Sequence, residues 1–254
     1  MKYLVVLLVS ILIISCKEDV KYKMQSKNLT AQEIIDKAIV TSCQGKCDHV
    51  VIEFSFRDKQ YRSSRNNGKY KLERIKKDSL NTIHDVVTNN GLYRYINEEL
   101  TNVPDTMAVK ISDGVNSVHY FAQLPYGLNA EAVHKKLLGE DIIKGTDYYE
   151  IEVTFSEDGG GTDFDDSFMY WINKETFTVD YLAYKYATNG GGVRFREAYN
   201  PRVVEGIRFV DYYNFKPDNK EVSLPELDQL FTDEKLVLLS KIETKNVKVI
   251  IPKN

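Results

Sequence analysis

The sequence predicts an α+β protein, mainly β, in which a strongly curved antiparallel sheet has helices covering one face. The 254 residues include 17 Tyr and 11 Phe but only 6 Pro, a composition typical of pleated, half-buried strands. Val50, Ile52, Phe54 and Phe56 alternate with polar residues, which indicates antiparallel strands with one face in water. Stretches of helical spacing are few and cluster apart from the strands, as in α+β and not α/β proteins.

The pattern of residues from 28 to 96 predicts a helix followed by a run of strands. Thr30 and Glu33 have the spacing of a capping box at the start of a helix over 28–42. Ile34 and Ile35 lie on the apolar face of that helix. After the strand at 50–57, further strands are expected over 61–65, 70–75, 80–87 and 92–96, and Asn89-Asn90-Gly91 predicts a hairpin turn between the last two.

The second part returns from helix to strand. Met107, Ile111 and Val115 have helical spacing within 105–124, although Gly114 is compatible with an interruption. A short helical turn is expected over 130–138. Strands are then expected over 150–155, 168–172, 179–186, 193–198 and 207–213, followed by a short helix over 224–231 and closing strands over 236–242 and 247–251.

The amino terminus predicts a targeting segment. Lys2 precedes an apolar run over 4–14, which is shorter than the about twenty apolar residues that a membrane-spanning helix needs. The ending Ile14-Ser15-Cys16 resembles the lipobox of bacterial lipoproteins, which implies lipidation of Cys16. The alternative is an ordinary signal peptide with an incidental cysteine. We therefore expect a lipoprotein signal peptide over 1–15, a lipidated Cys16 with a flexible tether over 16–27, and a single domain over 28–254.

The residues after Cys16 leave the final location open. Lys17, Glu18 and Asp19 resemble the export signal of some surface-exposed lipoproteins, and the alternative is a generic polar tether on the periplasmic side. We expect an outer-membrane protein anchored by its acyl groups, on either the periplasmic or the cell-surface face. The net charge of −3, which becomes −4 after loss of Lys2, argues against a nucleic-acid partner.

The two remaining cysteines predict a local disulfide. Cys43 and Cys47 flank Gly45, and an even number of cysteines in an oxidising compartment favours pairing. Two free thiols and half of a metal site are the alternatives. A second pair of metal ligands is absent from the surrounding sequence.

Several motifs together resemble a known group of proteins. They are the segments 120–126, 159–161, 170–172, 180–184 and 206–209. These resemble an uncharacterised lipoprotein family of flavobacterial type, which is itself similar to the LolA/LolB-like lipoprotein carriers. The resemblance implies a half-open β-barrel whose concave apolar face is lidded by helices.

The sequence shows no motif of a known catalytic site. H-E-x-x-H, G-x-S-x-G and the Walker lysine motif are absent, and the four His are scattered. Asp163, Asp165 and Asp166 in a glycine-rich segment are candidate calcium ligands, and a solvated hairpin loop is the alternative. We expect no cofactor and no enzymatic activity.

Aromatic residues predict a ligand cavity in the half-barrel. The candidates are Phe121, Tyr170, Trp171, Tyr181, Tyr184, Phe195 and Phe209. One face could form a concave pocket for an apolar ligand, and a closed core filled by the same rings is the alternative.

These observations predict an outer-membrane lipoprotein that binds a lipid, a lipoprotein acyl chain or another apolar ligand. A structural or protein-interaction lipoprotein of the cell envelope is the second hypothesis, and a metal-dependent hydrolase is the third. The sequence gives no oligomeric state.

Overall fold

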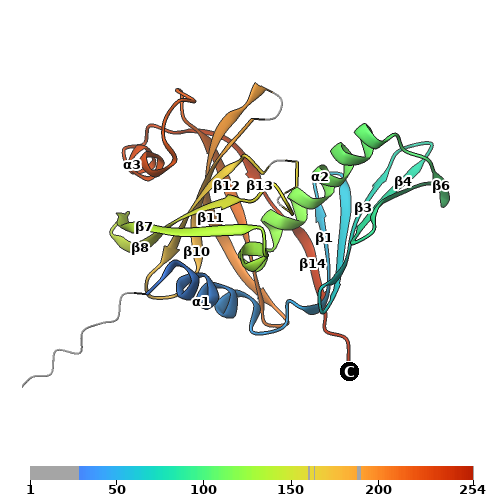
Figure 1. Ribbon diagram of the computed structural model, residues 1–254, viewed down its shortest axis with the longest axis horizontal. Coiled ribbons are helices and arrows are strands. Elements are labelled where there is room, and N and C mark those ends of the chain that lie inside the picture. The colour runs from blue at the N-terminus through green and yellow to red at the C-terminus, as the bar shows by residue number, and fades with distance from the viewer. Residues whose placement is uncertain (1–28, 160, 163, 188–189, 254) are drawn as a thin grey trace, which may run out of the picture.

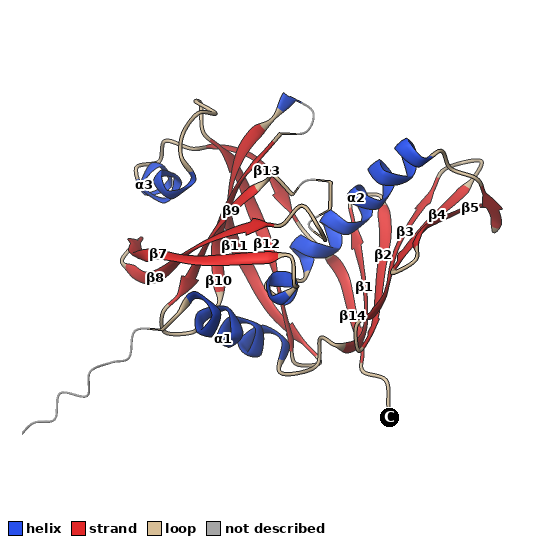
Figure 2. Cartoon of the chain, viewed as in Figure 1, coloured by secondary structure: helices blue, strands red, loops and turns tan. Residues whose placement is uncertain are grey.

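Two seven-stranded antiparallel sheets make up most of the protein in the computed structural model (Figures 1 and 2). The structure describes residues 29–159, 161–162, 164–187 and 190–253. The predicted fold class, mainly β with a curved antiparallel sheet and a few helices, is confirmed.

The first sheet has the order β14-β1-β2-β3-β4-β5-β6. Its strands are β1 (His49–Phe56), β2 (Lys59–Asn66), β3 (Lys69–Lys77), β4 (Thr82–Thr88), β5 (Gly91–Ile96), β6 (Glu99–Thr101) and β14 (Lys245–Ile250). From β1 to β6, consecutive strands pair as a meander, and β4 and β5 meet at the predicted Asn89-Asn90 turn.

The second sheet has the order β13-β12-β11-β10-β9-β8-β7. Its strands are β7 (Val133–Ile143), β8 (Thr146–Phe155), β9 (Ser167–Asn173), β10 (Val179–Tyr186), β11 (Gly192–Val204), β12 (Ile207–Lys216) and β13 (Val237–Ile242). This sheet is also a meander, because each of these strands pairs with its neighbour in sequence.

The two sheets are linked where β13 passes directly into β14. Only Glu243 and Thr244 separate the two strands, so one segment of chain pairs with β12 in the second sheet and with β1 in the first. At the other ends, β6 and β7 have a strand on one side only within the described chain. The sheets therefore form a half-open barrel and not a closed one.

Helix α1 (Ala31–Cys43) covers the inner face of the second sheet (Figure 1). The predicted capping box is confirmed, because Thr30 Oγ1 accepts from Glu33 N and the Glu33 side chain accepts from Thr30 N. Ile34, Ile35 and Ala38 are fully buried and pack with residues of β8, β9 and β10. Burial of these side chains fixes the helix on the sheet.

Helix α2 (Asp105–Ala122) runs between the two sheets (Figure 2). The helix is unbroken despite Gly114. A Cβ atom at position 114 would lie 3.2 Å from Arg74 Nη1, so glycine leaves room for the Arg74 guanidinium. His119, near the end of α2, is 1% exposed and contacts the rings of Phe54 and Tyr61 edge to face. This contact attaches the helix to β1 and β2.

The predicted helical turn over 130–138 is wrong. The chain instead forms the 3₁₀ helix η1 (Tyr126–Asn129) and then enters β7 at Val133. Pairing with β8 satisfies the backbone groups of 133–143, and such tertiary pairing overrides weak local propensity. The short strand β6 was not predicted from the sequence.

The predicted short helix near the carboxyl terminus is found as η3 (Leu224–Glu226) followed by α3 (Leu227–Thr232).

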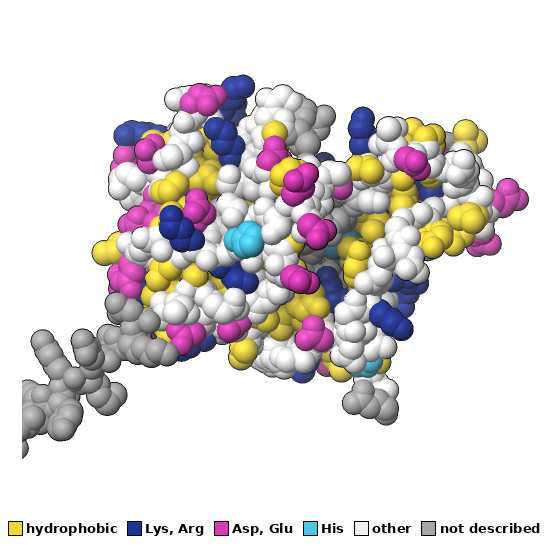
Figure 3. Space-filling model, in the orientation of Figure 1, with side chains coloured by type: hydrophobic (Ala, Val, Ile, Leu, Met, Phe, Trp, Pro, Cys, Tyr) yellow, Lys and Arg dark blue, Asp and Glu magenta, His cyan; other side chains and the backbone are white. Residues whose placement is uncertain are grey.

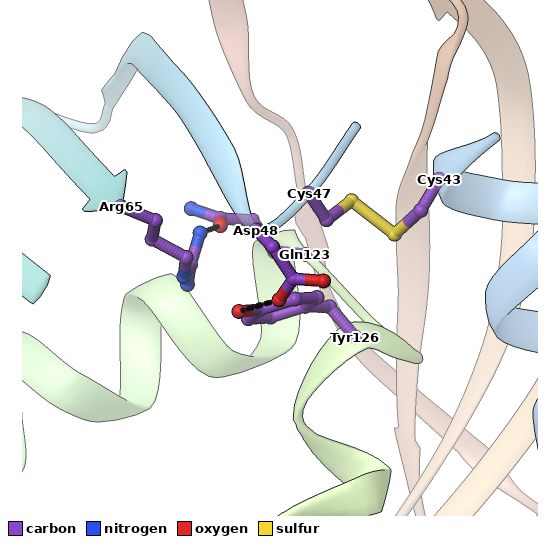
Figure 4. The surroundings of a disulfide bond; sticks show 6 residues. All are labelled: Cys43, Cys47, Asp48, Arg65, Gln123 and Tyr126. Carbon is purple, nitrogen blue, oxygen red and sulfur yellow. Dashed lines mark hydrogen bonds between the residues drawn. A yellow bond between two sulfur atoms is a disulfide. The ribbon is translucent and has the colours of Figure 1, made fainter. Parts of the chain in front are cut away.

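A disulfide joins the end of α1 to the segment before β1 (Figure 4). The Cα atoms of Cys43 and Cys47 are 5.4 Å apart. Next to it, Tyr126 Oη donates to Asp48 Oδ1 at 2.9 Å, and the Arg65 guanidinium lies 4.4 Å from the centre of the Tyr126 ring. Arg65 also donates to Gln123 Oε1. These contacts hold α1, η1 and the first sheet together.

A buried polar network holds the link between the two sheets. Asp211 on β12 is 3% exposed and accepts from Thr244 N at 3.0 Å, from Asn200 Nδ2 at 2.7 Å and from Arg202 Nη2 at 3.1 Å. Arg202 Nη2 also donates to the carbonyl oxygen of Thr244 at 2.6 Å. Both backbone polar groups of Thr244 are thereby bonded at the point where the chain leaves one sheet for the other.

Replacing Asp211 by Ala should lower the free energy of unfolding by about 3 kcal/mol, because it leaves the Arg202 charge and the Thr244 amide without their partner. The matched control is Glu140→Ala, which breaks the 2.6 Å ion pair with Lys174 at an exposed site and should change stability by less than about 1 kcal/mol. Urea denaturation measures both. Equal small losses in the two variants would show that the network does not hold the link.

Candidate ligand-binding cleft

An open cleft of about 550 Å³ lies on the inner side of the barrel. Its walls are the carboxyl-terminal half of α2, the inner face of the second sheet and the turn between β1 and β2. The apolar lining comprises Phe56, Val118, Phe121, Phe155, Phe168, Val210 and Ile242. The volume falls within the roughly 300–1,000 Å³ of small-molecule sites.

Aromatic rings form one wall of this cleft. The Phe121 ring of α2 lies 5.3 Å from the Tyr184 ring and 6.2 Å from the Phe168 ring, and Phe168 and Tyr184 stack at 5.4 Å. Such spacings are those of attractive aromatic pairs. The wall therefore keeps its shape because helix and sheet contribute to one cluster.

Three tyrosines next to this wall have neutral hydroxyls. Tyr120 Oη and Tyr170 Oη form a 2.6 Å hydrogen bond, and burial raises the pKa of both phenols above the ordinary value. Burial likewise raises the pKa of Tyr212 to about 12, although the charge of Arg196 acts in the opposite direction. These three phenols carry no negative charge at neutral pH.

Arg196 is a buried cation in the cleft. It is 7% exposed, and its guanidinium lies 3.9 Å from the centre of the Phe121 ring and 5.0 Å from that of Tyr184. Nη2 donates to Tyr184 Oη at 2.7 Å, whereas Nε is buried without a hydrogen-bond partner. Among the described residues, no carboxylate forms an ion pair with it.

The rim of the cleft is also mainly basic. Arg194 contacts the Tyr186 ring and donates to its hydroxyl at 2.7 Å, and Arg57 is an exposed residue in the turn after β1. Asp166 is the acidic residue of the described lining. Three arginines and one aspartate give the lining a formal charge of +2.

Two of the seven predicted cavity residues line this cleft, namely Phe121 and Tyr184. Tyr170 lies directly behind it, bonded to Tyr120. Phe209 packs elsewhere inside the barrel, with residues of β1 and the two disulfide cysteines.

The other three predicted cavity residues lie on the outer face of the second sheet. Trp171, Tyr181 and Phe195 pack under η3 and α3. Side chains alternate between the faces of a strand, so Trp171 points away from its neighbour Tyr170. The seven aromatic residues therefore do not share one face, because this sheet is covered on both sides.

Arg194 and Arg196, which line the cleft, were missed by the reasoning from sequence. The alternation of side chains along a strand does place Arg194 and Arg196 on one face of β11 and Val193 and Phe195 on the other. An apolar face is expected to point inward, which would place Val193 and Phe195 inside and the two arginines in solvent. With α3 covering the apolar face, the arginine side of β11 turns into the barrel.

The remaining predicted site residues are Cys16 and the candidate calcium ligands Asp163, Asp165 and Asp166. Cys16, with the signal peptide and tether, and Asp163 of the candidate calcium loop lie outside the described residues. Asp165 is exposed, and Asp166 lies at the rim of the cleft. Within the described ranges, no three His, Cys, Asp or Glu side chains are grouped as a metal site would require. Nor does any helix of those ranges have the length and apolar character needed to cross a membrane.

The half-open barrel and its aromatic cleft define a β-rich protein with a ligand-sized opening beside a crossing helix. The chain belongs to a family of unknown function, DUF6503, whose model matches residues 3–244. This agrees with the uncharacterised family expected from the motifs. No curated protein matches the sequence.

Solved structures resemble the fold. A DUF1329 family protein from Desulfovibrio piger is 12% identical over 89% of this chain and 96% of its own, with a TM-score of 0.54. A LolA superfamily protein from Nitrosomonas europaea is 16% identical over 87% and 94%, with a TM-score of 0.49. A putative outer membrane lipoprotein-sorting protein domain from Vibrio parahaemolyticus is 9% identical over 88% and 94%, with a TM-score of 0.47. At such identities a likeness concerns the fold and assigns no ligand.

The outer face under α3 has a titrating group of its own. Asp228 is 5% exposed, and burial, together with a hydrogen bond to Asp141, raises its pKa to about 7. A carboxyl with a raised folded-state pKa favours folding in its protonated form, so this contribution is lost as the pH rises toward and through 7.

Asp228→Asn should therefore raise the free energy of unfolding at pH 8.5 by on the order of 2 kcal/mol and leave it nearly unchanged near pH 4. Denaturant titrations of both proteins at the two pH values measure this difference. A constant offset between them at both pH values would contradict ionisation of Asp228 as the cause.

Proposed function

We propose that this protein binds a lipid, a lipoprotein acyl chain or another apolar ligand in the cleft, without a covalent step. The observation that carries the proposal is the aromatic wall of Phe121, Phe168 and Tyr184 around an opening of about 550 Å³. Burying each ligand methylene there is worth about 0.8 kcal/mol. A chain of moderate length therefore has enough apolar contact to bind.

The proposal includes attachment to the outer membrane. The apolar run over 4–14 and the Ile14-Ser15-Cys16 ending support a signal peptide over 1–15 and acylation of Cys16. Two or more acyl chains give durable anchoring, whereas one gives marginal binding. The tether over 16–27 would connect this anchor to the domain over 28–254, and the face of the membrane stays open.

One observation favours contact with another envelope protein as a second function. Leu100 on β6 and Met107 on α2 are 65% and 50% exposed, and hydrophobic side chains gather at this end of the first sheet (Figure 3). Exposed apolar patches commonly mark interaction sites. Crosslinking to a partner at this patch by a protein whose cleft takes up no lipid would favour this function alone.

Ser117→Trp should weaken binding of a fluorescent fatty-acid probe at least tenfold. Ser117 is an exposed residue of α2 that lines the cleft, so an indole at this position occupies ligand space without disturbing the core. The measurement is a fluorescence titration of the mature protein produced without its acyl groups. Lys110→Trp, at an exposed position on the same helix, is the control and should bind normally. If the two variants bind equally well, the ligand lies elsewhere, and if even the unmodified protein binds no probe, the proposed function fails.

Cys16→Ala should abolish incorporation of a palmitate analogue and move the protein from the membrane fraction to the soluble fraction. The thiol is the atom that would carry the diacylglycerol, so its loss removes the anchor. Metabolic labelling followed by fractionation of Gram-negative cells measures both effects. Cys43→Ala, which leaves Cys16 in place, is the control, and unchanged labelling of Cys16→Ala would reject the anchor.

A further inference from the structure

We propose that the ligand of this cleft is an anionic amphiphile whose carboxylate or phosphate group binds Arg196, while its chain packs on the neighbouring aromatic wall. This inference rests on the proposed function and specifies its ligand class. Arg196, 7% exposed and without an acidic partner among the described residues, is the feature that carries it.

A buried cation without a counter-ion is costly. Arginine stays protonated in proteins, and a buried charge normally has a paired carboxylate. Two half-buried arginines of this protein follow that pattern: Arg202 pairs with Asp211 at 3.1 Å, and Arg74 pairs with Asp85 at 2.8 Å. Within the described chain, Arg65 has no carboxylate partner either and donates to Gln123 Oε1, whereas Arg196 is more deeply buried and lines a cleft that gives access to a ligand.

The groups around Arg196 orient it without neutralising it. The rings of Phe121 and Tyr184 hold the guanidinium by cation–π contact. The Tyr184 hydroxyl accepts one N–H, and Nε remains without a partner. A guanidinium has five N–H donors arranged to match the oxygens of a carboxylate or phosphate. The site therefore offers a preorganised fork with unused donors.

The charge of the surrounding cleft favours the same ligand. Arg194, two residues before Arg196 on β11, and Arg57 both line the opening. With Asp166 counted against them, the lining has a formal charge of +2, whereas the whole chain has a net charge of −3. The formal charge of the cleft is thus opposite in sign to the net charge of the protein, and this positive charge attracts an anion to the opening.

The test compares probes with the same twelve-carbon chain and different heads. Dodecanoate and dodecyl phosphate are titrated against dodecanol into the mature protein produced without its acyl groups, by calorimetry or by displacement of a fluorescent fatty acid. A hydrogen-bonded charge pair predicts that at least one anion binds about tenfold or more tightly than dodecanol. Preference for dodecyl phosphate over dodecanoate would indicate a phospholipid head, and the reverse preference a fatty acid.

Arg196→Met should remove this preference and leave dodecanol affinity within about twofold. Met keeps an unbranched apolar side chain against Phe121, and thermal unfolding of the variant checks its fold. Lys185→Met is the matched control, because it removes the same charge from an exposed residue of β10 and should retain the preference. Arg196→Lys keeps the charge but not the fork, and should bind the anions with intermediate strength.

Each remaining outcome separates the two proposals. If dodecanol and both anions bind the unmodified protein equally, apolar binding stands and the anionic head is rejected. If Arg196→Met weakens all three probes to the same degree, Arg196 only shapes the wall, and the inference is overturned. If none of the probes binds, the proposed function itself fails. The comparison of heads on the unmodified protein needs no variant, so it holds even if Arg196→Met does not fold.

Discussion

The attachment of β13–β14 to Asp211 is the constraint on which the rest of this architecture depends. A single run of chain serves as the edge strand of both sheets, and its turn at Thr244 is held by a carboxylate buried on β12. A hydrogen-bonded charge pair at such a position fixes geometry more than it adds stability. The angle between the two sheets, and hence the opening of the barrel, follows from this bend.

The half-open shape then requires α2 to lie where it does. With β6 and β7 unjoined, the inner faces of both sheets would be open to water, and α2 covers part of each. Ile111 and Val115 pack on β3 and β4, whereas Phe121 reaches the aromatic cluster of the second sheet. The helix does not fill the space beside β11 and β12. The cleft is therefore the space that remains between the two sheets and this helix.

Local patterns in the sequence predicted most of the elements, because capping at Thr30, the turn at Asn89 and alternation along β1 are set by neighbouring residues. They failed at 130–138, where pairing with β8 decides the structure. They also did not show which side chains of β9 and β11 point into the barrel. Alternation divides residues into two faces but does not say which one faces inward when α3, more than thirty residues beyond β10, covers one of them. That choice decided whether Phe195 or Arg196 lines the cleft.

The position of Arg196 costs stability, and the proposed anionic ligand would offset that cost. A Leu or Met at this position would complete the apolar wall and leave no unpaired charge, and a glutamate nearby would neutralise it. The chain instead surrounds the guanidinium with Phe121, Tyr184 and Tyr212, which lower the free energy of a buried cation by only a few kcal/mol at most. Sites that retain such a cost commonly do so because a ligand removes it. The same rings that make the charge tolerable supply the apolar contact for a chain attached to an anionic head, so one cluster of residues accounts for both halves of the proposed ligand.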